Sequence, residues 1–598
     1  MPEYKAPLRD MRFLLHEVFD IADHYRRTGY PEVGAEDVDA VLSEGAKFCE
    51  EVIAPLNASG DAEGCHWEGG KVTTPKGYRE AYAAYREAQW GSISSDPEYG
   101  GQGLPQSLEL FFNEMAVTAS TSFRLASGLS MGAVHVLEQH GTDAQKRTYL
   151  PKLISSEWTG TMCLTEPHAG SDVGILTTSA TPDGDDAYRI QGTKIFITYG
   201  EHDLADNIVH LVLARLPDAA RGAKGISLFV VPKFLPGPDG SPGEPNGVHC
   251  ASIEHKLGIH GSPTCVLNFD NAKGFLVGPP HGGLRCMFTM MNYARIDVGM
   301  HGLGQAERAF QGSVAYARER LQFRAPDGPV LPDKRADPII VHPDVRRMLL
   351  TQKAVSEGCR ALSYLAAMQL DVEHRHEDAD ARQAGGELLA FLIPITKGML
   401  TEAGFEAANS GIQVFGGYGY IRETGMDQYM RDCRITSIYE GTNAIQANDL
   451  LGRKVLGSDG ALLRRFGALI DELCDATQGN SQVAPLSKQL RAVNADWQAL
   501  ALRIGGRVAD SKAELGAAAF DFLMYSGYTA LGYLWLRMGH VAATRLAEGA
   551  ADRAFYEAKI KTARFYFARL LPRTAAHSAA IDSGADNLLA LAESDFIL

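Results

Sequence analysis

One carboxylate in the sequence has a setting that suits proton transfer: Glu440, in Ile438-Tyr-Glu-Gly-Thr-Asn443. It lies between an apolar run and Gly441-Thr442, so we expect its side chain to leave a packed element and face a cavity. Partial loss of water raises the pKa of a carboxylate, which suits a general base. A helix-terminal glutamate in a salt bridge is the alternative interpretation.

A second stretch, Met162-Cys-Leu-Thr-Glu-Pro-His-Ala-Gly-Ser-Asp172, offers groups that could bind a flavin ring edge or a pyrophosphate. Pro167 and Gly170 predict a turn, and a glycine lets a ligand approach the backbone closely. Thr165 and Ser171 supply hydroxyl and backbone N–H groups. Taken alone, the stretch also fits an ordinary connection between a strand and a turn.

Two further segments have compositions that suit a bound cofactor. Gln413-Val-Phe-Gly-Gly-Tyr-Gly419 predicts a turn at which a ligand can approach the backbone closely. The segment also fits a plain loop between helices. Arg318-Glu-Arg-Leu-Gln-Phe323 combines cationic and aromatic side chains, which suit a phosphate and a planar ring. An ordinary amphipathic helix end has the same composition.

Several patterns of nucleotide and metal sites are absent. No G-x-G-x-x-G follows a predicted strand, and neither a Walker loop nor H-E-x-x-H occurs, so a Rossmann unit would not hold a nucleotide cofactor. The nine cysteines include no C-x-x-C pair, and His374 and His376 lie in a charged loop. We therefore expect no metal site and no disulfide framework, as in a reducing compartment.

The elements that must position these residues change character twice along the chain. Apolar residues spaced three and four apart, as in Leu108–Ala116, predict helices up to about residue 160. Residues 161–283 predict a β domain inserted in a helical protein. Its clearest strands are Lys194–Tyr199, Asn207–Arg215 and Gly225–Pro232. The helical period then returns, and Pro343 is expected to open a helix of roughly 28 residues in a bundle.

The composition is that of a globular protein, with 598 residues, 45% hydrophobic and 22% charged. A net charge of -16 without a Lys/Arg-rich run argues against binding to nucleic acid. The N-terminal stretch lacks an apolar signal region, so we expect a cytoplasmic protein. The apolar stretch Phe522–Leu536 is too short to span a bilayer; a buried helix is favoured over a surface-lying membrane contact.

Five motifs, in order, resemble the acyl-CoA dehydrogenase family over about residues 35–460. TEPHAGSD resembles the family's TEPGAGSD, KIFITYG its K-x-(W/F)-I-T-N-G strand, and RLQFR its RxQFG. QVFGGYGY resembles QxxGGxGY, and MRDCRITSIYEGTNAIQ resembles MRDxRxxxIYEGTxxIQ. The N-terminal flank, with PLRDMRFLLHEVF, and the helical tail after about residue 460 resemble an extended subgroup of the family. This subgroup includes bacterial fatty acyl-CoA and 3-methylmercaptopropionyl-CoA dehydrogenases.

The resemblance implies a mainly α fold with an inserted β domain. We expect an N-terminal helical extension (1–35), an N-terminal helical domain (36–160) and a middle β domain (161–283). A C-terminal four-helix bundle with the catalytic base (284–457) and an additional helical domain (458–598) would follow.

The resemblance also implies FAD as the cofactor and an acyl-CoA thioester as the substrate. Glu440 matches the catalytic base. Positions that match flavin contacts are Met162, Cys163, Leu164, Thr165, Gly170, Ser171, Phe196, Ile197, Thr198 and Thr442. Positions that match contacts to a FAD in the neighbouring subunit are Arg320, Gln322, Phe323, Gln413, Phe415, Gly416 and Gly417. Positions that match substrate contacts are Ser171, Asn292, Arg295 and Gly441.

The sequence departs from the family pattern at three places. His168 replaces a glycine in the first motif, Arg324 replaces the glycine after RxQF, and residues 325–340 form a longer connection than usual. The last two departures affect the adenine end of the predicted FAD site.

The implied reaction is oxidation of an acyl-CoA, most simply a fatty acyl-CoA in β-oxidation, to its trans-2-enoyl-CoA. The alternatives are a 3-methylmercaptopropionyl-CoA dehydrogenase and, less favoured, an acyl-CoA oxidase. A catalytically idle assembly partner is a further alternative, and Glu440 argues against a nitroalkane-oxidase-like enzyme, which normally uses Asp. We expect electron-transferring flavoprotein as the electron acceptor and a homo-oligomer, with a dimer favoured.

Overall fold

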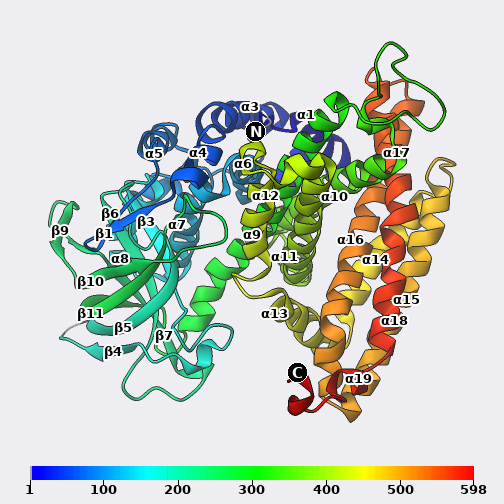
Figure 1. The fold of residues 1–598 in the computed structure, drawn as a ribbon. Helices are drawn as coiled ribbons and strands as arrows, with labels where there is room; N and C mark the ends of the chain where they lie inside the picture. The colour runs from blue at the N-terminus through cyan, green and yellow to red at the C-terminus, as the bar shows by residue number, and fades with distance from the viewer. Residues whose placement is uncertain (1–2, 185, 598) are drawn as a thin grey trace. The chain divides into compact units, whose positions relative to one another are not determined.

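The computed structural model describes residues 3–184 and 186–597, which divide into two compact units (Figure 1). One unit is Glu44–Asp297, and the other combines Met1–Ser43 with Val298–Leu598. Helices α3 (Ala35–Phe48) and α9 (Gly283–Glu319) cross the boundary between the units in sequence. The helical architecture with one β domain confirms the predicted fold class.

The unit Glu44–Asp297 contains the β domain, in which a seven-stranded sheet is formed by the described residues. Its strands are β3 (Trp158–Cys163), β4 (Ser179–Pro182), β5 (Ala187–Thr198), β6 (Asn207–Arg215), β7 (Ile226–Pro232), β10 (Val248–Ile253) and β11 (Thr264–Val277). Strand β11 pairs with β5 and β7, β6 pairs with β4 and β7, and β4 pairs with β5. These strands therefore close into a ring, with β3 and β10 added at its sides. Short hairpins join β1 (His66–Glu68) to β2 (Lys71–Thr73) and β8 (Phe234–Pro236) to β9 (Pro242–Pro245).

Strand β6 shows why the apolar runs predicted strands correctly. Its side chains alternate between two cores, with Val209 and Leu211 in one and Val212 and Ala214 in the other. Both faces are covered, so an almost continuous apolar run is the expected sequence of such a strand. The first of the two cores also holds side chains of the adjacent helices. Helices of this unit are α4 (Leu56–Glu63), α5 (Tyr78–Glu87), α6 (Gln106–Ala119), α7 (Thr121–His140) and α8 (Asp143–Ile154).

The other unit is helical. Its helices before the tail are α1 (Leu8–Arg12), α2 (Ile21–Arg27), α10 (Pro343–Arg375), α11 (Ala379–Phe415), α12 (Met426–Arg434) and α13 (Asn443–Asn448). Those of the tail are α14 (Ala461–Ala476), α15 (Ala484–Asp510), α16 (Ala513–Ala547), α17 (Arg553–Arg569), α18 (Thr574–Asp582) and α19 (Asp586–Leu589). Pro343 does begin α10, which has 33 residues. Neighbouring helices α14, α15, α16 and α17 run side by side (Figure 1).

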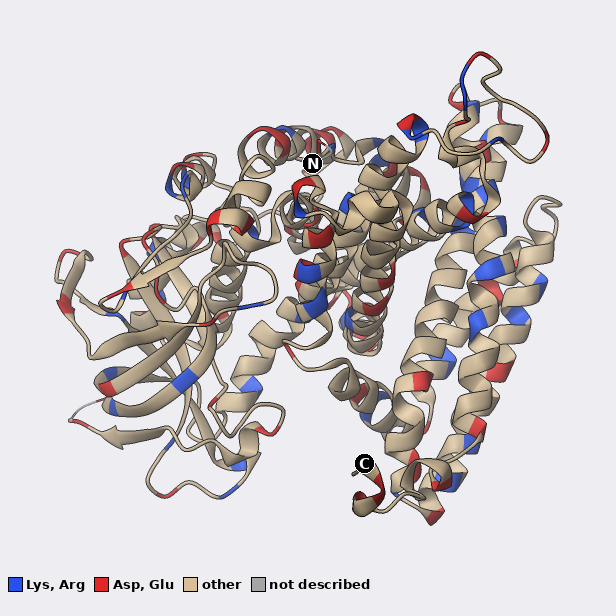
Figure 2. Ribbon diagram, in the orientation of Figure 1, with Lys and Arg blue, Asp and Glu red and all other residues tan. Residues whose placement is uncertain are grey.

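The most apolar helices of this unit are buried. By length and composition α11 could cross a membrane, and among the described residues it alone passes that test, yet 78% of its apolar window is buried inside the protein. It is therefore a core helix of the bundle. The stretch Phe522–Leu536 lies within α16 and is buried throughout, as the favoured interpretation predicted. Lys/Arg and Asp/Glu are interspersed along α14–α17 (Figure 2).

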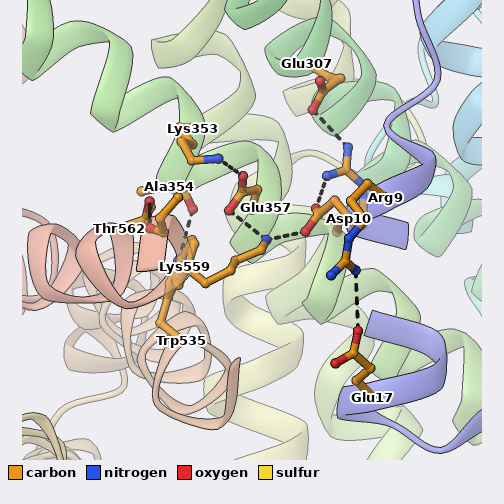
Figure 3. Close-up of polar contacts among 12 residues, drawn as sticks. Arg9, Asp10, Glu17, Glu307, Lys353, Ala354, Glu357, Trp535, Lys559 and Thr562 are labelled. Carbon is orange, nitrogen blue, oxygen red and sulfur yellow. Dashed lines mark hydrogen bonds and ion pairs between the residues drawn. The ribbon is translucent and has the colours of Figure 1, made fainter. Parts of the chain in front are cut away.

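A buried network of charged side chains joins the N-terminal segment and the C-terminal tail to the bundle (Figure 3). Asp10 of α1 binds Arg360 of α10 at 2.5 Å and also pairs with Lys559 of α17. Arg360 reaches Glu307 of α9 at 2.9 Å, and Lys559 reaches Glu357 of α10 at 2.8 Å. Charges of opposite sign are thus paired inside the protein, where an unpaired charge would be strongly destabilising.

Residues around Asp10 add further contacts between the N-terminal segment and the tail. Arg9 bonds Asp552 at 3.0 Å, and Glu17 accepts hydrogen bonds from Arg545 at 3.1 Å and Tyr556 at 2.9 Å. The N-terminal extension and the additional helical region therefore pack against each other as well as against the bundle.

Candidate functional site

Glu440 lies in a turn between a 3₁₀ segment, Ile435–Ser437, and the short helix α13. Its backbone is left-handed, with φ 56°, and Gly441 follows with φ 86°. The left-handed conformation suits glycine but costs a residue such as glutamate about 1–3 kcal/mol. Strain of this size persists where surrounding contacts hold the backbone, and it is common at functional sites.

The residues after Glu440 hold this turn on the side of α13. The Thr442 hydroxyl caps the helix by accepting from the Ile445 backbone N–H at 3.3 Å. The buried Gln446 amide donates to the carbonyls of Glu440 and Gly441 at 3.4 Å each. Next to the cap, Asn443 accepts from Lys397 of α11 at 2.8 Å. The predicted flavin contact Thr442 thus also has a structural role.

The predicted flavin-lining stretch begins in β3 and ends in an exposed turn. Alternation along the strand puts the Cys163 side chain in the β-domain core, whereas Met162 and Leu164 are only partly buried. A flavin contact at Cys163 therefore has to come from its backbone. Gly170 and Ser171 are exposed, and a Cβ at Gly170 would meet no atom within 4 Å.

Glu166, in the same stretch, is a structural residue. Its carboxylate accepts from Lys194 at 2.8 Å, from both the backbone and hydroxyl of Thr177, and from both groups of Thr178 at 2.6–2.9 Å. Burial opposes its ionisation, but Lys194 and these hydrogen bonds outweigh that effect and bring the pKa of Glu166 to about 2. A carboxylate that is ionised at neutral pH and has several hydrogen-bond donors is poorly suited to accept a proton.

Phe196 presents an aromatic ring near the end of β5. Its side chain is 58% exposed and its backbone φ is 59°. A bulky residue in the left-handed region is an outlier, and exposing its ring adds no packing that would offset the cost. Ile197 points into the core, and Thr198 is half-buried. The strand end therefore offers a planar face and a hydroxyl, as a flavin ring would need.

The structure brings most residues of the other predicted cofactor segments into one pocket of about 590 Å³. Arg320 and Gln322, just after α9, face Phe415, Gly416 and Gly417 at the end of α11 across this pocket. Phe323 and Gln413 are exposed and do not line it. The pocket offers a cation, an amide and open backbone, which suit a phosphate-containing ligand.

Two departures from the family pattern, Arg324 and the longer connection 325–340, form one compact loop near this pocket. Arg324 binds the Leu331 carbonyl at 3.0 Å and Asp337 at 3.4 Å. The Asp337 carboxylate accepts from the backbone N–H groups of Ala325, Val330 and Leu331 at 2.7–3.0 Å, which lowers its pKa. The arginine that replaces the family glycine therefore ties the insertion together.

The predicted substrate contacts on α9 differ in exposure. Asn292 is exposed, whereas Arg295 is buried and lies over the Phe288 ring at 5.7 Å. Within the described part of the chain, no group of three or more His, Cys, Asp or Glu side chains could hold a metal ion. One unit offers the backbone and hydroxyl donors of Thr165 and Ser171, and the other unit holds Glu440 and the cationic pocket.

Comparison with known proteins supplies the family. Models of the acyl-CoA dehydrogenase N-terminal, middle and C-terminal domains match residues 35–157, 161–272 and 281–455, and a model called acetyl-CoA dehydrogenase C-terminal like matches 466–592. The chain belongs to the acyl-CoA dehydrogenase family and is a flavin-dependent oxidoreductase that uses FAD.

The chain is similar over nearly its whole length to relatives from bacteria. It is 43% identical to the 3-methylmercaptopropionyl-CoA dehydrogenase of Ruegeria pomeroyi, covering 98% of this chain and 99% of the relative. It is 33% identical to the broad-specificity linear acyl-CoA dehydrogenase of Mycobacterium tuberculosis, covering both chains fully. An acyl-CoA dehydrogenase of Bacillus anthracis, solved with FAD, has a TM-score of 0.73 at 21% identity, covering 94% of this chain and 90% of that one, and so shares the fold.

Proposed function

We propose that the protein oxidises an acyl-CoA thioester to trans-2-enoyl-CoA, with Glu440 as the catalytic base. The observation that carries this proposal is the strained, capped turn in which Glu440 is followed by Gly441 and Thr442. A carboxylate fixed in this way can be aligned with a substrate C–H bond, and alignment contributes strongly to rate.

The residues of the chain have separate tasks in this reaction. Glu440 accepts the α-proton, and its own backbone N–H stabilises the negative charge that develops on the thioester oxygen. Phe196, Thr165 and Ser171 would hold FAD from one unit, while Arg320 and Gly416–Gly417 match contacts to a FAD of a partner subunit. When bound, FAD supplies the acceptor for the β-hydrogen as hydride.

A fatty acyl-CoA is the first substrate candidate, because the linear acyl-CoA dehydrogenase of Mycobacterium tuberculosis is similar over the full chain. 3-Methylmercaptopropionyl-CoA is the second, because the relative named for it is 43% identical. This acyl group has the length of a pentanoyl group with one methylene replaced by sulfur. A hydrophobic pocket separates groups that differ by one methylene by only about 10–200-fold.

A panel of acyl-CoAs tests both the reaction and the substrate. Straight chains from butyryl- to stearoyl-CoA would be compared with 3-methylmercaptopropionyl-CoA by anaerobic bleaching of the flavin absorbance. Pentanoyl-CoA is the matched control for the thioether. We expect rapid bleaching by at least one member. No bleaching by any member of the panel would contradict the proposed reaction.

We further propose that electrons leave through electron-transferring flavoprotein, as in a dehydrogenase. Turnover with that protein or a ferricenium salt should be much faster than with oxygen. Substantial hydrogen peroxide formation in air would instead favour an acyl-CoA oxidase.

A further inference from the structure

We propose that His301 is a positioning residue, which fixes the turn of Glu440 by a hydrogen bond to Tyr439. This inference rests on the proposed role of Glu440 and concerns how the chain holds that carboxylate. Tyr439 directly precedes Glu440, and its phenol shares a hydrogen bond with Nδ1 of His301 on α9. The imidazole tautomer decides which of the two groups donates.

His301 is itself immobilised by its surroundings. Its side chain is 1% exposed, and the two rings are tilted by 58° with their centroids 5.9 Å apart. The next residue, Gly302, touches α11 directly: a Cβ there would lie 2.5 Å from the Leu400 carbonyl oxygen. A Cβ at Gly404 of α11 would in turn lie 2.4 Å from the Gly302 carbonyl oxygen. The two helices thus meet backbone to backbone at the residue after His301, which fixes α9, and with it the backbone of His301, against α11.

The two helices in contact also hold both sides of the turn. Before Glu440, α9 reaches Tyr439 through His301. After Glu440, α11 reaches Asn443 through Lys397 at 2.8 Å, Thr401 at 2.9 Å and Glu402 at 2.7 Å. The strained residue lies between these two points of attachment. Loss of the His301 bond would release the side on which the chain enters the turn.

The first test measures the order of the turn, without substrate, in the FAD-loaded full-length protein. His301→Leu removes the hydrogen-bonding ring, and Tyr439→Phe removes only the hydroxyl. We expect each to increase amide hydrogen exchange in peptides that cover residues 438–442 by about tenfold or more. His301→Asn, whose amide can replace Nδ1, should restore much of the protection. Unchanged exchange in both His301→Leu and Tyr439→Phe would overturn the proposal.

The second test measures flavin reduction in a single turnover with the acyl-CoA that bleaches the wild type fastest. A small displacement of a reacting group can cost about 10²-fold, so we expect the rate constant to fall about 10–100-fold in His301→Leu and Tyr439→Phe. Substrate affinity and FAD content should change little, because neither variant alters the predicted binding groups. The double variant should be no slower than the slower single variant. Additive losses would show that the two residues act independently and would refute the proposal.

Ser313→Ala is the matched control. Ser313 is also buried on α9 and accepts a hydrogen bond from Gln352 at 3.2 Å. It lies 12 residues after His301, about 18 Å along the helix. We expect it to lower stability without changing exchange at residues 438–442 or the rate of flavin reduction. Equal effects of Ser313→Ala and His301→Leu would reduce His301 to a general packing role. A wild type that no acyl-CoA bleaches would instead contradict the proposed function, while the exchange test would still decide whether His301 holds the turn.

Discussion

Asp10 and Lys559, separated by 549 positions in the sequence, form an ion pair inside the helical unit. Lys559 is 1% exposed and also binds Glu357 of α10, so one ammonium group joins the N-terminal segment, the bundle and the tail. Burial raises the pKa of the Asp10 carboxyl, but Lys559 and Arg360 outweigh burial and bring it to about 2. Asp10 is therefore ionised throughout the physiological range.

Lys559→Met should destabilise the helical unit strongly. Methionine fills similar space but leaves Asp10 and Glu357 without this cation, and breaking one side of a buried pair typically costs about 3–5 kcal/mol. The midpoint of thermal unfolding, followed by circular dichroism, would measure the loss. Lys561→Met on the same helix is the control, because Lys561 is exposed and its pair with Glu557 is a surface pair of 3.4 Å. A similar midpoint in both variants would contradict a stabilising role for Lys559.

Glu440→Gln should nearly abolish flavin reduction by acyl-CoA. Glutamine has almost the same size as glutamate, and the substitution leaves the backbone N–H in place. The side-chain amide cannot accept a proton at neutral pH. A positioned general base contributes about 10²–10⁴-fold, and we expect the upper end of this range. FAD content and acyl-CoA affinity should stay at the wild-type level. Glu472→Gln, at an exposed glutamate, is the control, and both quantities should stay at that level there too. Residual activity within about tenfold of the wild type would place the base elsewhere.

Glu166→Gln should lower stability in a way that depends on pH. In the folded protein the pKa of Glu166 is about 2, below its ordinary value of 4.5. Ionised Glu166 therefore stabilises the fold fully at pH values above about 4.5. This stabilisation is lost as pH falls from about 5 towards 2. The difference in unfolding midpoint between wild type and variant should therefore be largest near neutral pH and shrink in acid. A constant difference across that range would argue against an ionised Glu166.

Gly417→Leu should reduce FAD content without weakening the fold. A Cβ at Gly417 would meet nothing within 4 Å, so a larger side chain enters the open pocket beside Arg320 and not the protein core. Gly479→Leu, at an equally open and exposed glycine, is the control. Full flavin content in Gly417→Leu, measured by absorbance after purification, would remove this pocket from the FAD site.

The protein should be at least a dimer, because the pocket of Arg320 and Gly417 is expected to complete the FAD site of a partner. We propose that the tail after residue 457 covers the surface of a second pairing, which would leave a homodimer. Light scattering coupled to size exclusion measures the particle mass. A monomer that keeps its flavin would contradict the shared site, and a tetramer would contradict the covering role of the tail.

Local features of the sequence were the predictable part. The strand Asn207–Arg215 was predicted to the residue, since its apolar run reflects burial on both faces. Gly441 and Thr442 singled out Glu440, and both do shape the turn in which it lies. Its role as the catalytic base stays a prediction. Pro343 marked the start of α10, because proline is favoured in the first turn of a helix.

Features that depend on distant residues were missed. Asp10 and His301 each have a partner that no local pattern identifies, Lys559 and Tyr439. Glu166 was expected to hold its own turn, but its pairing with Lys194 was missed. The lysine of the KIFITYG motif was the one available signal for Glu166, since a lysine in a strand that is to be buried needs an acidic partner. The side-chain direction of Cys163 could have been anticipated from strand alternation, which places it opposite Met162 and Leu164.

The pairing of Asp10 with Lys559 also sets a timetable for biosynthesis. At about 5–20 residues per second, a ribosome needs roughly half a minute to two minutes to travel from one residue to the other. Glu44–Asp297, a continuous segment, can acquire its structure during that interval. Phe13 waits longer, because its ring contacts with Phe555 and Tyr556 form only after α17 has emerged. Nascent chains that stall before α17 would thus leave the Phe13 ring without these contacts and available to chaperones.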